Sequence, residues 1–223
     1  MGERRDRHRS SKRPQGATQR ARGRPRDPQK REAIVRAAER LLFAADPQLL
    51  RMERIAQEAG VSKATLYAYF PNLNAVLRAV IQNHRATMTA ALDRSPRHTA
   101  DVRAALVEFG DALLDFITGK EALAVQRMLA ADPVLRRRVG SLIYREGPAA
   151  MRSKVAQWID LARIRGDLRI GDPERAAEQL LGMWQGTLTV ALLMGARPRP
   201  SAAERRRIVR EAVDVWLRAH APV

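Results

Sequence analysis

Hydrophobic residues recur along this chain at the three- and four-residue spacing of helices, and no segment shows the alternation typical of a strand. Asp27-Pro28 is an N-cap followed by proline at the first helical position. It precedes a stripe that comprises Ile34, Ala38, Leu41, Leu42 and Ala45. Asn72 precedes a second helix that runs to about Leu92, with an inward stripe of Val76, Leu77, Val80 and Ile81. The pattern predicts an all-α fold.

Capping residues and prolines divide the next part of the chain into further helices. We expect helices over residues 120–131 and 99–118, the latter with an apolar side of Val102, Leu106, Phe109, Leu113, Phe116 and Ile117. A longer helix begins at Asp132-Pro133. It should be broken at Gly147-Pro148, because proline lacks the backbone N–H that a helix needs, and should resume to Arg165.

The last two predicted helices indicate a dimer. One begins at Asp172-Pro173, and from Leu180 to Met194 it is apolar nearly all round, so it needs cover on more than one side. The other begins at a capping box of Ser201 and Glu204, and one of its stripes comprises Ile208, Ala212, Val215, Trp216 and Ala219. With a second copy, these helices would form a four-helix interface. A monomer with a central penultimate helix is the alternative.

Residues 50–69, LRMERIAQEAGVSKATLYAY, read as two short helices joined by a tight turn. Gly60 can adopt the positive φ that a three-residue turn requires. Val61 is expected to be a buried plug, and Ser62 is a strong N-cap for the second helix. The first helix has one buried face, formed by Met52, Ile55 and Ala56.

The second of these short helices carries side chains suited to DNA. It buries Leu66 and Phe70 four residues apart. Its outer face is expected to present Lys63, Thr65, Tyr67 and Tyr69, whose groups can bind phosphates and base edges. Together with Ser62 and Ala64 at the start of the helix, these residues form the candidate DNA-binding set. Any α-hairpin could carry an Ala-Gly turn, but the ordered combination of features is too specific for that interpretation.

The segment IAQEAGVSKATLYAYF resembles the helix-turn-helix signature of the TetR family of bacterial transcriptional regulators. The resemblance covers about residues 27–220 and is detailed over about residues 31–77. It implies a three-helix DNA-binding domain over residues 27–87 and a helical ligand-binding and dimerisation domain over residues 88–223. A two-fold dimer would read a palindromic operator, with recognition helices about one DNA turn, ~34 Å, or a multiple of it apart.

The sequence departs from the family pattern at three places. Leu50 and Arg51 stand where Thr or Ser usually caps the helix before the turn. Asp46-Pro47 follows the first helix, where glycine is common. Leu73 stands where a basic residue commonly begins the fourth helix, so an expected phosphate contact is missing.

Charge favours a polyanionic partner and is concentrated at the N-terminus. The formal net charge is +17, and residues 1–26 carry ten Arg or Lys residues against Glu3 and Asp6, a net +8. This segment has no apolar periodicity and no aromatic residue, so we expect it to be disordered in the free protein. Its end, with Arg24 and Arg26, resembles arms that enter an A·T-rich minor groove. A merely solubilising tail is the alternative.

Little in the sequence indicates catalysis, a metal or a membrane. There is no cysteine, and His8, His84, His98 and His220 share no metal-ligand spacing. No cofactor is expected. The apolar run from residue 180 to 195 is interrupted by polar residues and is shorter than the ~20 residues of a membrane span. With no secretory signal in view, we expect a cytoplasmic protein.

The sequence thus predicts a ligand-responsive repressor that binds double-stranded DNA and is released by a small, largely apolar effector of unknown identity. Candidate ligand residues, of a kind that more often forms plain core than a pocket, are Phe109, Phe116, Met128, Tyr144, Trp158 and Trp184. An architectural or non-specific DNA-binding protein is the alternative, although it would need neither the helix-turn-helix nor a separate helical domain. A second alternative is a helical ligand-carrying protein in which the helix-turn-helix motif is vestigial.

Overall fold

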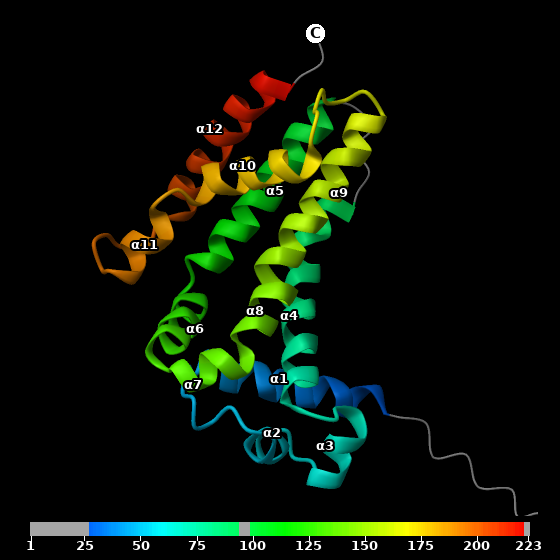
Figure 1. The fold of residues 1–223 in the computed structure, drawn as a ribbon, viewed down its shortest axis with the longest axis vertical. Helices are drawn as coiled ribbons and strands as arrows, with labels where there is room; N and C mark the ends of the chain where they lie inside the picture. The colour runs from blue at the N-terminus through cyan, green and yellow to red at the C-terminus, as the bar shows by residue number, and fades with distance from the viewer. Residues whose placement is uncertain (1–26, 94–98, 221–223) are drawn as a thin grey trace, which may run out of the picture.

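The computed structural model describes residues 27–93 and 99–220, and within these two segments it contains helices and no strand. The first helices are α1 (Pro28–Phe43), α2 (Met52–Glu58), α3 (Lys63–Tyr69) and α4 (Leu73–Thr89), the last extended by a 3₁₀ turn, η1 (Ala90–Asp93). Figure 1 shows α1, α2 and α3 gathered at one end of an elongated molecule, with α4 running from them toward the other end. The predicted all-α fold is confirmed.

The helices at this end begin where the sequence predicted. The Oδ1 atom of Asp27 accepts a hydrogen bond from Gln29 N at 2.9 Å, and Oδ1 of Asn72 accepts one from Ala75 N at 3.0 Å. Inward residues of all four helices then share one core, which includes Ile34, Leu42, Ile55, Leu66, Val76 and Leu77. The same core takes in residues from beyond the proposed boundary at residue 87, namely Val125, Met128, Leu135, Val139 and Leu142. The packing therefore crosses the boundary that we proposed along the chain.

A second core fills the other end of the molecule. It lies among α5 (Thr99–Ile117), α9 (Ala150–Ile164), α10 (Pro173–Gln185) and α12 (Ala202–His220). Phe109 and Trp184 are fully buried there, with ring centroids 5.6 Å apart. Helix α5 lies directly against α12 at Gly110, because a Cβ added to this glycine would lie only 2.6 Å from Val209 Cγ1. Glycine at this position therefore allows α5 and α12 to pack closely.

The helix expected to break at Gly147-Pro148 does not break. After α6 (Lys120–Ala131), helical backbone continues through α7 (Pro133–Leu135), η2 (Arg136–Gly140), α8 (Ser141–Tyr144), η3 (Arg145–Ala149) and α9. Both η2 and η3 are π-helical turns, and Pro148 lies inside η3. A π turn bonds residues five apart, so it accommodates a proline that would clash in an α-helix. The prediction of an interruption was wrong.

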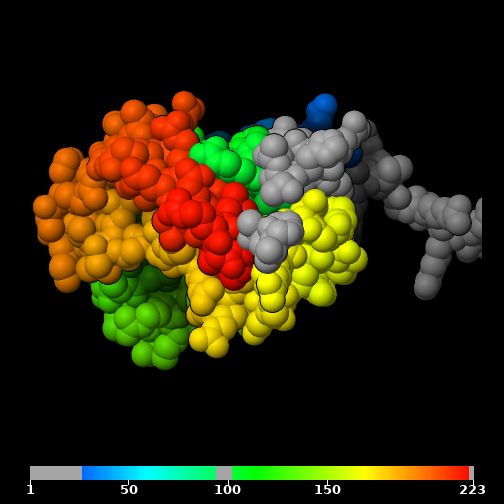
Figure 2. All heavy atoms as spheres, turned by 90° about the horizontal axis from the view of Figure 1, so that it is seen from above, coloured from blue at the N-terminus to red at the C-terminus, as the bar shows by residue number. Residues whose placement is uncertain are grey.

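The chain does break where a continuous helix was expected. Gly186, with φ +45°, ends α10, and the next helix, α11 (Leu188–Leu193), starts two residues later. The apolar run that the sequence assigned to one helix is therefore two helices in different directions. Figure 2, which looks along the long axis, shows the orange residues around α11 on one side of the molecule, yellow residues toward the other side, and the red residues of α12 between them.

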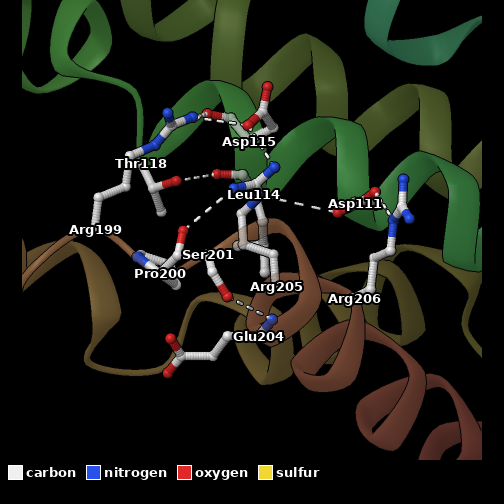
Figure 3. Close-up of polar contacts among 10 residues, drawn as sticks. All are labelled: Asp111, Leu114, Asp115, Thr118, Arg199, Pro200, Ser201, Glu204, Arg205 and Arg206. Carbon is white, nitrogen blue, oxygen red and sulfur yellow. Dashed lines mark hydrogen bonds and ion pairs between the residues drawn. The ribbon is translucent and has the colours of Figure 1, made fainter.

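Helix α12 begins in a cluster of ion pairs with α5 (Figure 3). Arg205, 9% exposed, places Nη2 2.6 Å from Asp115 Oδ1, and Arg206 Nε lies 2.9 Å from Asp111 Oδ2. Ser201 Oγ accepts from the N–H of Glu204, as the capping box predicted, but the Glu204 carboxylate pairs with Arg197 instead.

The stripe predicted on α12 divides between two environments. Trp216 and Ala212 are buried in the protein's own core, whereas Val215 is 47% exposed and Ala219 is exposed. Part of the apolar surface that the sequence assigned to a dimer interface is thus already covered within one chain.

Candidate nucleic-acid interface

The turn between α2 and α3 has the geometry that the sequence predicted. Gly60 has φ +65°, and a Cβ built there would meet nothing within 4 Å, so backbone conformation rather than space requires glycine. Val61 N donates to Ala56 O at 3.0 Å and so closes the turn. Val61 itself is half-buried against the core, not the fully buried plug that was expected.

The start of α3 is held by two bonds to one hydroxyl. Ser62 Oγ accepts from Thr65 N at 3.1 Å and lies 2.8 Å from Thr65 Oγ1. The first bond confirms Ser62 as the N-cap. The second fixes the rotamer of Thr65, which is half-buried, so its methyl and hydroxyl groups are presented in one orientation.

The outer face of α3 is formed by Lys63, Ala64 and Tyr67. Tyr67 is 48% exposed, and Lys63 and Ala64 are also exposed. Lys63 Nζ lies 3.7 Å from Glu53 Oε1, but both side chains are more than half exposed, and an ion pair of this kind contributes little. The lysine is therefore able to exchange this partner for a phosphate.

Tyr69 does not lie on the outer face as expected. It is half-buried and packs against the core of α1–α4. Its hydroxyl donates to the backbone carbonyl of Asp27 at 3.1 Å. The last residue of α3 is thereby joined to the N-cap residue of α1, and Arg24 and Arg26, which lie outside the described residues, precede that residue by only a few positions.

Four exposed cations at the starts of α1 and α2 were not among the predicted site residues: Lys30, Arg31, Arg51 and Arg54. Arg51 occupies the N-cap position of α2 and makes no side-chain cap bond. The departure from the family's Thr or Ser at this point was the sequence signal for it. Leu73, by contrast, is buried, so the first residue of α4 faces the core.

The six candidate ligand residues do not line one cavity. Phe109, Trp158 and Trp184 belong to the second core, and Met128 belongs to the first. Phe116 is half-buried, with its ring centroid 5.4 Å from that of His84. Tyr144 is 62% exposed, so its assignment to the core was wrong. Helical spacing predicted buried faces and did not show which faces meet.

Helix α4, which runs between the two ends of the molecule, is hydrogen-bonded to the π turn η3 through Glu146. Arg78 Nε donates to Glu146 Oε1 at 2.9 Å, Gln82 Nε2 lies 3.4 Å from Oε2, and Arg85 donates to the Glu146 backbone carbonyl at 2.6 Å. Burial raises the pKa of Glu146, but the hydrogen bonds from Arg78 and Gln82 and the charges of Arg78 and Arg85 outweigh it. The pKa therefore lies below its ordinary value.

Within residues 27–93 and 99–220, no cluster of three His, Asp or Glu side chains is arranged to hold a metal ion. In the same segments, none of the helices combines the length and apolar character that crossing a membrane requires.

Comparison with known proteins identifies the family. Residues 34–80 match the bacterial regulatory proteins of the tetR family, and residues 104–222 match the C-terminal domain of AefR-like transcriptional repressors. The chain belongs to the TetR family. It is therefore a helix-turn-helix transcriptional regulator and not an enzyme.

Several relatives of this TetR-family regulator are similar over different lengths. The regulator Rv1255c of Mycobacterium tuberculosis is 30% identical over 189 residues, 82% of each chain. The transcriptional activator FasR of Mycolicibacterium smegmatis is 32% identical over 109 residues, 49% of each chain. The match to YdeS of Bacillus subtilis covers 53% of that protein, so the alignment spans about half the length of FasR and of YdeS.

Solved structures show the same fold. The flavonoid-responsive regulator FrrA is 28% identical with a TM-score of 0.66, and the alignment covers 88% of this chain and 99% of FrrA. A TetR regulator from Agrobacterium tumefaciens gives a TM-score of 0.70 at 24% identity, over 88% of this chain and 96% of the other.

Proposed function

We propose that this TetR-family regulator is a dimeric repressor that binds a palindromic operator through α3 and is released by a small, largely apolar ligand. The observation that carries the proposal is the outer face of α3, where Lys63 and Tyr67 are exposed on a helix capped by Ser62. The similarity of residues 104–222 to a repressor domain supports repression, whereas FasR is an activator. Such a protein acts in the cytoplasm, where its DNA target lies.

In this proposal some protein–DNA contacts read the base sequence and others position the protein on the phosphate backbone. Tyr67, Thr65 and Ala64 meet base edges in the major groove, and Lys63 meets a phosphate. Arg51, at the N-cap of α2, and Arg54, within α2, supply further phosphate contacts, replacing the one that Leu73 cannot make. The cations of residues 22–26 follow the neighbouring minor groove, because Asp27 is bonded to the end of α3.

The dimer uses the exposed apolar side chains of α10, α11 and α12. These are Met183, Val190, Met194 and Val215. A second copy covering them would place two copies of α3 on one face of the DNA. The two-fold arrangement requires a palindromic operator.

Release follows from helix α4, because one of its ends packs in the DNA-binding core and the other joins the second core. A ligand among helices α4 to α10 that tilts α4 would change the distance between the two copies of α3. A coupling of about 1–3 kcal/mol lowers operator occupancy roughly 5–150-fold. The name of FrrA indicates response to a flavonoid in that protein, which supports an aromatic, largely apolar ligand for this one.

The test is selection of bound genomic fragments followed by gel-shift titration. Tyr67→Ala should weaken binding to the selected site by about 1–3 kcal/mol without loss of helicity. Tyr144→Ala, which removes another exposed tyrosine far along the chain, is the control and should leave affinity unchanged.

The same titration distinguishes a specific regulator from an architectural DNA-binding protein. A specific regulator prefers its own site to competitor DNA by ~10³-fold or more. An architectural protein would show no such preference, and that result would refute the proposal. Ligand binding should also weaken by the same factor when operator is present, because coupling is reciprocal.

A further inference from the structure

An open cleft lies between α1 and α6, where the DNA-binding core meets the rest of the chain. It consists of two hollows of about 640 and 660 Å³ that share Ala124 and Arg127 of α6. Each volume is within the range of about 300–1,000 Å³ typical of ligand sites. The residues that line the first hollow are Ala45, Pro47, Ala124, Arg127, Met128, Ala131, Asp132 and Pro133.

Three cations and three carboxylates line the cleft, and most of them already have a partner. Arg40 pairs with Glu58 at 2.9 Å, and Glu39 lies 2.6 Å from His84 Nε2. Lys120 has Glu121 within 3.9 Å, and Asp132 accepts from the backbone N–H groups of Val134 and Leu135. Of the lining cations, only Arg127 has no carboxylate partner among the described residues.

The wall opposite Arg127 is formed by the end of α1 and the loop that follows it. Ala45 lies there with φ +53°, a left-handed conformation that is unusual for a residue with a Cβ. Its N–H donates to Leu42 O at 3.1 Å, which ends the helix. Ala45 and Pro47 therefore present a fixed apolar surface toward α6.

We propose that this cleft binds a small amphipathic anion, with its carboxylate or sulfonate on Arg127 and its apolar body against Ala45, Pro47, Ala124 and Met128. An exposed guanidinium beside an apolar wall recognises both parts of such a ligand. The site differs from the effector site proposed above in having α1 and the loop after it as one wall, although Met128 was also a candidate effector residue. Because its two walls belong to α1 and α6, occupancy also fixes the orientation of the DNA-binding core. That consequence rests on the proposed function.

The binding test needs no DNA. The probe is 8-anilinonaphthalene-1-sulfonate, an aromatic body with one sulfonate, titrated calorimetrically into the full chain. Arg127→Gln should remove one site per chain or weaken it about tenfold, equivalent to ~1.4 kcal/mol. The control is Arg137→Gln, which makes the same charge change at an exposed arginine outside the cleft and should bind like wild type.

Two further arms make the result decisive. Ala124→Trp should fill the space shared by the two hollows and abolish the same site. N-phenyl-1-naphthylamine, which has the same body without the sulfonate, should bind wild type and Arg127→Gln equally. Identical sulfonate titrations for Arg127→Gln and Arg137→Gln, or an unaffected Ala124→Trp, would overturn the proposal. Loss of operator binding by Tyr67→Ala is independent of these titrations, so failure of the site and failure of the proposed function are distinguishable.

Discussion

Replacing Glu146 with alanine tests how strongly α4 is fastened to the long helix beside it. The change removes the carboxylate that Arg78 and Gln82 contact and leaves the bond from Arg85 to the backbone carbonyl. A hydrogen bond to a charged group contributes about 1.5–3 kcal/mol in protected sites. The Glu146 side chain is 20% exposed and that of Arg78 46%, so solvent screening reduces the value. We expect a loss of about 1–2 kcal/mol in the free energy of unfolding at neutral pH.

This loss should depend on pH. The pKa of Glu146 in the folded protein lies below its ordinary value of 4.5. The ionised carboxylate therefore contributes stability above that ordinary value, and the contribution disappears as pH falls through the folded pKa. The difference between wild type and Glu146→Ala should accordingly be largest near neutral pH and shrink in acid.

Urea unfolding followed by circular dichroism measures both effects. Glu178→Ala on α10 is the control, because Glu178 is exposed and has no ion pair among the described residues, and it should change stability by less than about 0.5 kcal/mol. If Glu146→Ala and Glu178→Ala unfold alike at neutral pH, the contacts with α4 contribute no net free energy. If the difference grew in acid, the sign assigned to the pKa shift would be wrong.

Three other changes have defined outcomes. Gly110→Ala should lower stability by about 1–3 kcal/mol in thermal unfolding because of the 2.6 Å approach to Val209, whereas Gly182→Ala, with open space around it, should not. Deleting residues 1–26 should flatten the slope of log K against log salt by about 0.9 for each phosphate that the segment neutralises, with the preferred site unchanged; an unaltered slope would mean that the segment stays in solvent. Val215→Glu should shift sedimentation toward monomer, and an unshifted profile would remove α12 from the interface.

The parts of the fold that follow from local chemistry could be predicted from the sequence. Asp27, Ser62 and Asn72 cap helices because each side chain bonds an N–H two or three residues ahead, which needs no distant partner. The turn at Gly60 likewise depends on one residue's φ.

The parts of the fold that depend on packing between distant residues could not be predicted from the sequence. The helix continues through Pro148 because a π turn accommodates the proline. Arg78, Gln82 and Arg85 of α4 bond Glu146 in the same turn, and these partners lie more than 60 residues away in the sequence. Tyr69 turns inward because the start of α1 offers a carbonyl from 42 residues away. Aromatic spacing predicted buried positions, but the separation of Met128 from Phe109 into two cores depends on how the helices cross.

The hydrogen bond from Tyr69 to the Asp27 carbonyl makes the position of the start of α1 independent of the sequence before residue 27. The acceptor is a backbone carbonyl, so the start of α1 is held beside α3 whatever side chains precede residue 27. Mutation can lengthen, shorten or recharge the segment before residue 27 without moving the point at which it joins the folded part. In the proposed function, the segment before residue 27 sets the overall strength of attachment to DNA and the exposed positions of α3 set the choice of site, so the two properties can evolve independently.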